Sequence, residues 1–300
     1  MAIKTVRAQI NGTWHTLTYD SASGAWKATI TAPGATSYNQ SGGYYNVTVE
    51  AANEAGTKAT ADGATLSGLR LVVKERVAPV ITILSPTSGA VVTNNKQPVV
   101  FTVVDESGGS GVNRNSIAVK LDGTAVANTT LAITSVTNGF SVTYTPASAL
   151  GDGNHTVSIN AADNDGNAAT AKSTTFKIDT VPPTLNITAP AEGLITASAS
   201  LTVKGTTNDA TSSPVTISIK LNGTDQGAVT VGSDGSFSKA ITLAEGSNTV
   251  VITATDSAGK TSSVTRTVTL DSSVPKVVSA AITPNPVDAG ATMIISVVIE

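Results

Sequence analysis

The chain has 300 residues, a formal net charge of −3 at pH 7 and only 13% charged residues. So few charges argue against a coiled coil, a disordered acidic tail and a nucleic-acid-binding protein. Hydrophobic residues make up 40% of the chain, which is enough for packed cores, and the length predicts two or three domains. Cysteine is absent, so disulfides and thiolate metal sites are excluded.

The chain opens on a predicted strand. Val6, Ala8 and Ile10 alternate with polar residues, as one face of a strand does. The opening residues lack the apolar run of a signal peptide, and no run of 18 apolar residues follows. We therefore expect a chain that is made in the cytoplasm and does not insert into membranes.

Aromatic residues are concentrated before residue 78. Trp26 shares a strand face with Ala28 and Ile30, which predicts a core position, whereas Trp14 lies on the face opposite Leu17. An exposed aromatic surface can stack on sugar rings, so we expect a glycan or receptor patch here. Its candidate residues are Trp14, Tyr38, Tyr44 and Tyr45.

Three segments of the chain repeat one pattern. Val47–Gly56, Val157–Gly166 and Val250–Gly259 each alternate, reach Asn or Asp, and end on Gly. Such a segment is typical of a strand that enters a hairpin. The spacing of the segments fits successive β-sandwiches and is too long for a solenoid repeat.

Prolines mark the predicted boundaries. Pro79, Pro183 and Pro275 each begin a similar strand and each follow a strand that ends in an acidic residue. Proline interrupts a strand ladder and stiffens a short linker. The predicted units are residues 1–77, 78–182, 183–275 and a two-strand segment, 276–300.

The third unit shows the strand pattern in detail. Val215, Ile217 and Ile219 alternate with polar residues before a turn at Asn222-Gly223. Period-two alternation between closely spaced turns predicts antiparallel β-sandwiches. A helical apolar pattern does not persist for three turns anywhere, so the predicted fold class is all-β.

These units resemble bacterial immunoglobulin-like (Big-type) domains. The resemblance rests on Asp256–Gly259, on the linker Asp179–Pro183 and on Asp105–Val112. Through Gly235–Phe237 and Glu245–Asn248, the third unit is also similar to accessory modules of carbohydrate-active enzymes. The resemblance implies an elongated string of tandem Ig-like sandwiches, as found in bacterial adhesin stalks, enzyme accessory regions and tailed-phage virions.

The resemblance also implies calcium, because acidic residues at the domain junctions of many such arrays bind it. Asp and Glu supply the oxygen ligands that calcium prefers. The alternative is that Asp in such a pattern caps tight turns by hydrogen bonds to the backbone. The first junction offers a poorer set, Asn53 and Glu75. The candidate calcium ligands are Asp163, Asp165 and Asp179 at one junction, and Asp256 and Asp271, which repeat the arrangement one unit later.

The sequence gives little support for catalysis. The two histidines, His15 and His155, fall in different predicted units, and His155 is predicted to lie at a strand rim. Motifs of serine hydrolases, zinc proteases and phosphate-binding loops are missing. The one adjacent acidic pair, Asp105-Glu106, lies at a strand end beside a Gly-Ser turn. We therefore expect a non-enzymatic protein.

Three settings fit such a chain. We expect a structural or interaction protein of a phage virion, of decoration or tail-fibre type, that acts by spacing and weak adhesion. A surface stalk needs an export signal and an anchor, and the sequence shows neither; the segment Thr283–Val287 is also similar to phage structural proteins. The alternatives are a bacterial cell-surface adhesin stalk and an accessory carbohydrate-binding region of a larger enzyme.

The last 25 residues begin like another unit and contain two predicted strands. An isolated hairpin is marginal in water, and the second strand is apolar on both faces. We expect it to dock on a partner, either another virion protein or a second copy of the chain. The alternatives are docking onto the third unit and a chain cut inside a fourth domain. The docking residues are Met293, Ile295, Val297 and Ile299.

Overall fold

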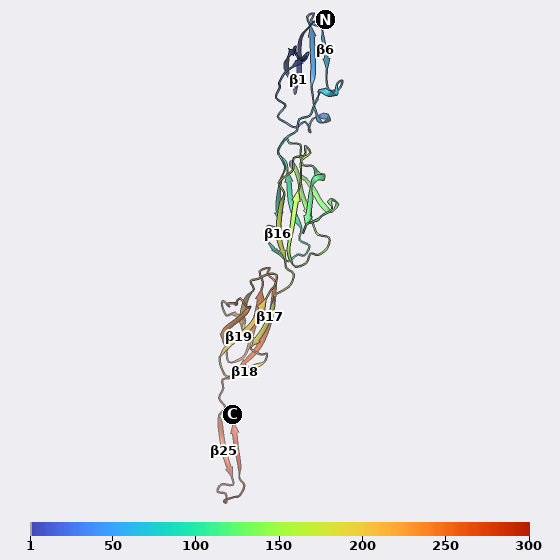
Figure 1. Ribbon diagram of the computed structural model, residues 1–300. Helices are drawn as coiled ribbons and strands as arrows, with labels where there is room; N and C mark the ends of the chain where they lie inside the picture. The colour runs from blue at the N-terminus through green and yellow to red at the C-terminus, as the bar shows by residue number, and fades with distance from the viewer. Residues whose placement is uncertain (1) are drawn as a thin grey trace. The chain divides into compact units, whose positions relative to one another are not determined.

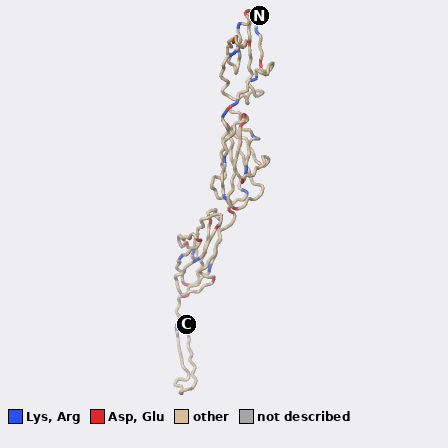
Figure 2. The backbone as a smooth tube through the Cα atoms, viewed as in Figure 1, with Lys and Arg blue, Asp and Glu red and all other residues tan. Residues whose placement is uncertain are grey.

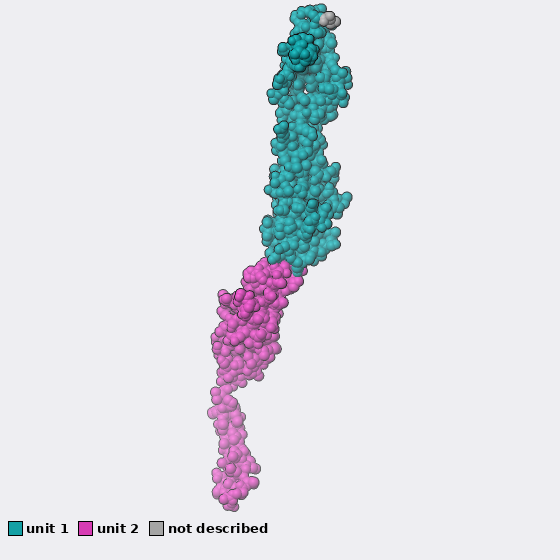
Figure 3. All heavy atoms as spheres, in the orientation of Figure 1, with its two compact units in different colours: residues 1–178 teal, residues 179–300 magenta. Residues whose placement is uncertain are grey.

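The computed structural model describes residues 2–300 (Figure 1). In these residues it contains 26 strands and four short 3-10 helices. The strands fall into two compact units, one ending at Ile178 and the other starting at Asp179 (Figure 3). No helix in the described residues is long and apolar enough to cross a membrane. The all-β fold class is confirmed.

The aromatic-rich start of the chain forms a five-stranded sheet and a short ladder. The sheet has the order β3-β2-β1-β5-β6, and the ladder joins β4 to β7. As predicted, Val6 and Ala8 of β1 are buried. The ladder is short, because each of its strands has two residues. The elements are β1 (Ile3–Ile10), β2 (Thr13–Asp20), β3 (Ala25–Lys27), η1 (Ser41–Gly43), β4 (Tyr45–Asn46), β5 (Thr48–Asn53), β6 (Lys58–Ala61), η2 (Ser67–Leu69) and β7 (Arg70–Leu71).

The second region is a sandwich of a four-stranded and a five-stranded sheet. Their orders are β13-β14-β10-β8 and β12-β11-β15-β16-β9. Its core contains Phe101, Ile117 and Phe176, all nearly inaccessible. The elements are β8 (Val80–Ser85), β9 (Val91–Val92), β10 (Val99–Val104), η3 (Arg114–Ser116), β11 (Ala118–Leu121), β12 (Thr124–Ala125), η4 (Asn128–Thr130), β13 (Leu131–Val136), β14 (Gly139–Tyr144), β15 (Gly153–Asn160) and β16 (Lys172–Ile178).

The third region repeats the sandwich with sheets of three and five strands. Their orders are β17-β19-β22 and β18-β24-β23-β20-β21. The core contains Ile219, Ile252 and Val268. The strands are β17 (Thr184–Ala189), β18 (Leu194–Thr196), β19 (Ser200–Asn208), β20 (Thr216–Leu221), β21 (Thr224–Asp225), β22 (Ser236–Thr242), β23 (Gly246–Thr255) and β24 (Thr261–Leu270).

The sandwiches are not wholly antiparallel, which differs from the prediction. β9 pairs with β16, and β18 pairs with β24, in parallel. Each of these short strands follows the first strand of its unit after a proline and joins the opposite sheet, beside the last strand of the unit. The chain thereby covers one edge of that sheet, which protects it from pairing with other chains.

The predicted turns lie where the sequence places them. Asp122 and Asn222 have positive φ values of 49° and 51°, and each connects two strands together with the following glycine. Asn tolerates this left-handed backbone and Gly adopts it freely. The remaining strands, β25 (Val277–Thr283) and β26 (Ile294–Ile299), form a separate two-stranded sheet.

Candidate functional site

Three aspartates gather at one end of the third sandwich. Asp179 precedes β17, Asp209 directly follows β19, and Asp256 directly follows β23. Each offers a carboxylate oxygen, and these atoms lie within 4.8 Å of one another. The three side chains come from segments far apart in the sequence, so only the sandwich fold brings them together.

Each aspartate uses one oxygen to fix its own loop. Oδ1 of Asp179 accepts a hydrogen bond from the Val181 amide, and Oδ1 of Asp256 accepts one from the Lys260 amide. Oδ1 of Asp209 accepts two, from the amides of Thr211 and Ser212. These are the local turn bonds that the alternative to calcium predicted.

Two of the other carboxylate oxygens in this cluster lack partners. Asp179 is 0% exposed and Asp256 is 6% exposed, and Oδ2 of each has no hydrogen-bond partner in the described residues. The hydroxyl of Ser212 is also buried without a partner. Buried carboxylates repel one another and lose hydration, so such a set requires a cation or protons.

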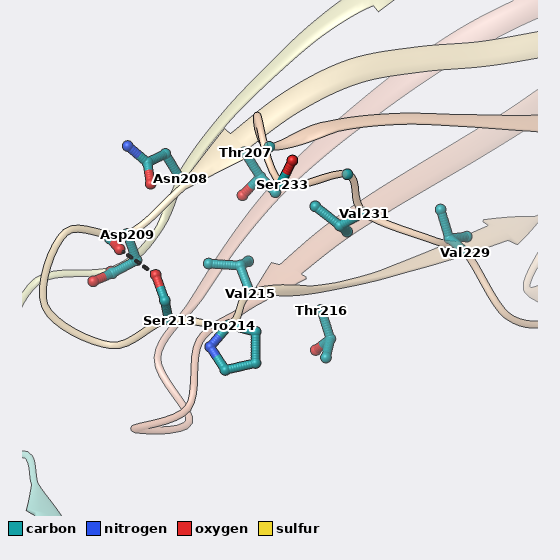
Figure 4. A pocket seen from close by; sticks show the side chains of 12 residues that line it. Thr207, Asn208, Asp209, Ser213, Pro214, Val215, Thr216, Val229, Val231 and Ser233 are labelled. Carbon is teal, nitrogen blue, oxygen red and sulfur yellow. Dashed lines mark hydrogen bonds between the residues drawn. The ribbon is translucent and has the colours of Figure 1, made fainter.

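The donor set fits a divalent cation that prefers oxygen. Carboxylate and hydroxyl oxygens without partners are the ligands that calcium takes. Asp209 lines an open pocket of about 440 Å³ whose wall includes Val215, Val229 and Val231 (Figure 4). The Ser213 hydroxyl donates to the Asp209 carbonyl at 2.7 Å and holds this loop in place.

A related cluster lies where the first region meets the second sandwich. Oxygens of Glu75, Asp105 and Glu106 lie within 4.8 Å of one another. Asp105 is 5% exposed, and its Oδ1 lacks a partner while its Oδ2 accepts from the Gly111 amide at 2.8 Å. Glu75 accepts a short hydrogen bond from the Ser110 amide.

Two of these carboxyl groups, Glu75 and Glu106, shift each other's pKa. A hydrogen bond to Glu75, together with burial, raises the pKa of Glu106 to about 7. Burial opposes ionisation of Glu75, but hydrogen bonds from Glu106 and Ser110 outweigh it and lower the Glu75 pKa. The first cluster can therefore keep a proton near neutral pH, which lessens the repulsion among its three acids.

The structure groups the predicted calcium ligands differently from the sequence, because it brings Asp179 together with Asp256. Asp179 and Asp256 join the cluster of the third sandwich. Asp163 is buried, and its oxygens accept from Gly166 and Asn167 within its own turn. Asp165 accepts from the Thr36 hydroxyl and the Glu75 amide. Asp271 is exposed and accepts from Ser273.

Sequence reasoning missed Asp209 but the repeat contains a signal for it. Asp105 and Asp209 each directly follow the second long strand of their unit, and Glu75 and Asp179 each lie four residues before a proline. A comparison of the two repeats by strand position pairs these residues. The first junction, predicted to be the poorer one, uses Glu75 as the counterpart of Asp179.

The aromatic candidates do not form one surface. Tyr45 is 5% exposed, and its hydroxyl donates to the Ala35 carbonyl, so its ring has no free face for a sugar. Tyr38 is 50% exposed, and Arg70 lies 5.1 Å above the ring of Tyr44.

Trp14 is exposed as predicted, but Arg7 lies 4.1 Å above its ring. Trp26 is only partly buried and contacts Tyr19, with ring centroids 5.6 Å apart. The predicted core position of Trp26 is thus only partly enclosed.

A seam of hydrogen bonds joins the first region to the second sandwich within the first compact unit. Asp165 accepts from Thr36 and from the Glu75 amide, and its carbonyl accepts from Lys74 at 3.2 Å. The amide group of Asn39 donates to the Gly109 carbonyl at 2.7 Å. These bonds, with those of Asn167 to Glu75, define the seam.

Two family models match the chain. Residues 86–180 match the bacterial Ig-like domain, and residues 183–272 match domain B of glucodextranase. The chain carries tandem bacterial immunoglobulin-like domains. No curated protein matches the sequence.

Several solved structures are similar to these tandem domains. The fibronectin(III)-like modules of Clostridium thermocellum CbhA are 15% identical, with a TM-score of 0.39 over 63% of this chain and 93% of that one. Sidekick-1 immunoglobulin domains 1–4 are 12% identical, with a TM-score of 0.39 over 90% and 68%. A bacterial ice-binding adhesin is 20% identical, with a TM-score of 0.31 over 89% and 86%.

Proposed function

We propose that this chain is a non-enzymatic structural protein whose Ig-like domains space and present binding surfaces. The seam around Asp165 is the observation that supports this function. It contains side-chain and backbone bonds from both of the regions that it joins. Such a seam fixes one domain against the next, which is what a spacer requires.

We also propose that the aspartate cluster of the third sandwich binds calcium. A cation held by Asp179, Asp209 and Asp256 would tie the entering linker to two loops of the third sandwich. The buried Oδ2 atoms without partners support this assignment. Calcium would supply charge neutralisation and fixed geometry there, and no chemistry on a substrate.

The proposed setting is a phage virion, in a decoration or tail-fibre role. Bacterial Ig-like domains also fit an extracellular or surface protein, so a cell-surface stalk is the second candidate. The glycan patch is narrower than the sequence suggested, because Tyr45 is buried. Tyr38, Tyr44 and Trp14 keep exposed or partly exposed rings and are the proposed contacts.

Pulsed electron–electron double resonance, which measures the distance between two spin labels, tests the spacer function. The chain lacks cysteine, so Thr60→Cys and Ser135→Cys place two spin labels on exposed strand positions of the two joined regions. We expect a narrow distance distribution that Asp165→Ala broadens, because this change removes the carboxylate of the seam. Asp225→Ala, at an exposed position of β21 in the third sandwich, is the control.

An equally narrow distribution in Asp165→Ala would contradict the spacer proposal. The setting is tested separately, by locating the chain in purified phage particles or in the cell envelope of its source. Recovery in the envelope alone would contradict the virion role and support the stalk.

A further inference from the structure

The first acidic cluster, Glu75, Asp105 and Glu106, closes around Gly109. A Cβ atom on this glycine would lie 2.8 Å from Oε2 of Glu75 and 2.8 Å from Oδ2 of Asp105. It would lie 2.9 Å from Cδ of Glu106. Glu75 comes from the linker after β7, whereas the other two acids come from the loop after β10. The absence of a side chain at Gly109 therefore lets carboxyl groups from both sides of the seam come together.

The cluster has more buried acceptor oxygens than donors. Oε2 of Glu75, Oδ1 of Asp105 and Oε2 of Glu106 are buried without a hydrogen-bond partner in the described residues. The linker reads Lys74-Glu75-Arg76, so that charges alternate along it (Figure 2). Even so, none of the three acids forms an ion pair with a Lys or Arg of residues 2–300. Carboxylates this close cannot all stay ionised without a neutralising charge.

The other charged groups around Glu75 add to the repulsion. Oδ2 of Asp165 accepts from the Glu75 amide at 3.0 Å, and its charge opposes ionisation of Glu75. The cation that contacts this group is Lys74, but its Nζ donates to the Asp165 carbonyl and not to a carboxylate. A proton on Glu106 would remove one negative charge and supply the missing donor toward Glu75. The hydrogen bond to Glu75, and then burial, raise the pKa of Glu106 to about 7.

The first region depends on the seam because it buries few apolar side chains. Its buried apolar residues in the described chain are Val6, Ala8 and Tyr45. Neither hydrophobic core contains a residue before Ile81. Polar contacts at the seam therefore carry much of the attachment of this region to the second sandwich.

Glu75 takes part in the seam through three of its groups. Its amide donates to Asp165, and its carbonyl accepts from the Asn167 side chain. Its carboxylate accepts from the Ser110 amide. A force that moves Glu75 away from the loop after β10 would thus break bonds on both sides of the linker.

We propose that Glu75 and Glu106 form a pH switch in the seam, closed when the carboxylic acid of Glu106 donates a hydrogen bond to the Glu75 carboxylate. As pH rises, Glu106 releases this proton to solvent, and the like charges push the linker away from the loop. The folded state raises the pKa of Glu106 from 4.5 to about 7, so its contribution is full below about pH 4.5 and is lost as pH rises through about 7. The pKa of Glu75 is lowered, so its carboxylate still accepts at mildly acidic pH. This inference rests on the proposed spacer function, because the switch acts on the same seam.

Pulsed electron–electron double resonance on the full chain at two pH values tests the switch. The spin labels are again at Thr60→Cys and Ser135→Cys, and EDTA is present throughout so that no metal ion replaces the proton. We expect the distance distribution to be about twofold broader at about pH 8.5 than at about pH 5.5, because repulsion among the carboxylates loosens the seam. The change should be centred near pH 7.

Glu106→Gln separates the switch from other titrating groups. The new side-chain amide donates to the Glu75 carboxylate at every pH, so the distribution should stay narrow at both pH values. His155 also has a raised pKa and is retained in this variant. A Glu106→Gln chain that broadens as much as the unaltered chain would therefore overturn the proposal. Glu54→Gln, at an exposed acid of the first region, is the matched control and should keep the full pH dependence.

The unaltered chain gives a second decisive result. Equal widths at the two pH values would also overturn the switch. The spacer function fails or stands separately, because Asp165→Ala at about pH 5.5 removes seam bonds while Glu106 keeps its proton. Broadening by Asp165→Ala without any effect of pH would leave the spacer in place and remove the switch.

Discussion

At the scale of single residues, His155 shows how one predicted rim residue is held. Its Nδ1 lies 2.7 Å from Oδ2 of Asp122, and its Nε2 lies 2.8 Å from the Gly151 carbonyl. Both ring nitrogens face acceptors, which favours the charged form of the ring. Burial opposes this charge, but the Gly151 carbonyl and the Asp122 carboxylate outweigh it and raise the His155 pKa.

This raised pKa makes stability depend on pH. The folded state holds the proton of His155 more tightly than the unfolded state. The contribution of the protonated ring to stability is therefore full below pH about 6.5 and is lost as pH rises through the folded pKa. We expect the second sandwich to lose up to about 1 kcal/mol of unfolding free energy between pH 5.5 and 8.5. Asp122→Asn should flatten this slope in urea titrations. An unchanged slope in Asp122→Asn would show that the pair has no such role.

At the scale of strands, the packing around Gly205 in the β17–β19–β22 sheet leaves no room for a side chain. It pairs with Ile187 on one side and with Phe237 on the other. A Cβ atom there would lie 2.5 Å from the Asn186 carbonyl oxygen and 2.7 Å from the Phe237 ring. The ring of Phe237, which is 5% exposed, fills the space above the glycine.

Gly205→Ala should therefore disrupt the three-stranded sheet. Overpacked cores lose roughly 1–3 kcal/mol, and the nearest atom here is backbone, which cannot swing away. We expect the unfolding midpoint of the third sandwich, followed by circular dichroism, to fall accordingly. Gly34→Ala is the matched control, since a Cβ atom there meets nothing within 4 Å. Equal stability of the two variants would contradict this account.

At the scale of the whole molecule, the aspartate cluster predicts that calcium stabilises the third domain. A ligand present at about 100 times its dissociation constant adds about 2.7 kcal/mol to stability, and each kcal/mol moves the midpoint of such a domain by roughly 4–8 °C. We expect calorimetry of the full chain to show a rise of about 10–20 °C that EDTA reverses.

Substitutions of two aspartates in the cluster test the calcium prediction. Asp209→Asn and Asp256→Asn should abolish the calcium response. They should also raise the midpoint in EDTA, because the like-charge repulsion is relieved. Asp271→Asn, which lies outside the cluster, should respond like the unaltered chain. If the unfolding midpoint of the unaltered chain does not change with calcium or EDTA, the cluster is not a calcium site.

The local features of this protein follow from the amino-acid sequence alone. Period-two alternation in segments such as Val215–Leu221 predicts strands, and Asn222-Gly223 and Asp122-Gly123 predict their turns, because both signals depend only on neighbouring residues. Repetition of whole segments predicted successive β-sandwiches, since each repeat must bury its own core, and the resemblance to bacterial Ig-like domains added the fold family. The proline pattern likewise indicated that residues 276–300 begin another unit.

Which side chains meet depends on the folded arrangement of distant segments. Asp163 and Asp256 occupy the same position in their repeats, yet the turn around Asp163 uses both its oxygens whereas Asp256 keeps one free. Tyr44 and Tyr45 are neighbours in sequence, yet Tyr45 is enclosed at 5% exposure. Asp209 joins the aspartate cluster because β19 ends beside the linker that carries Asp179. Such contacts depend on sheet register and packing between distant segments, which local pattern does not encode.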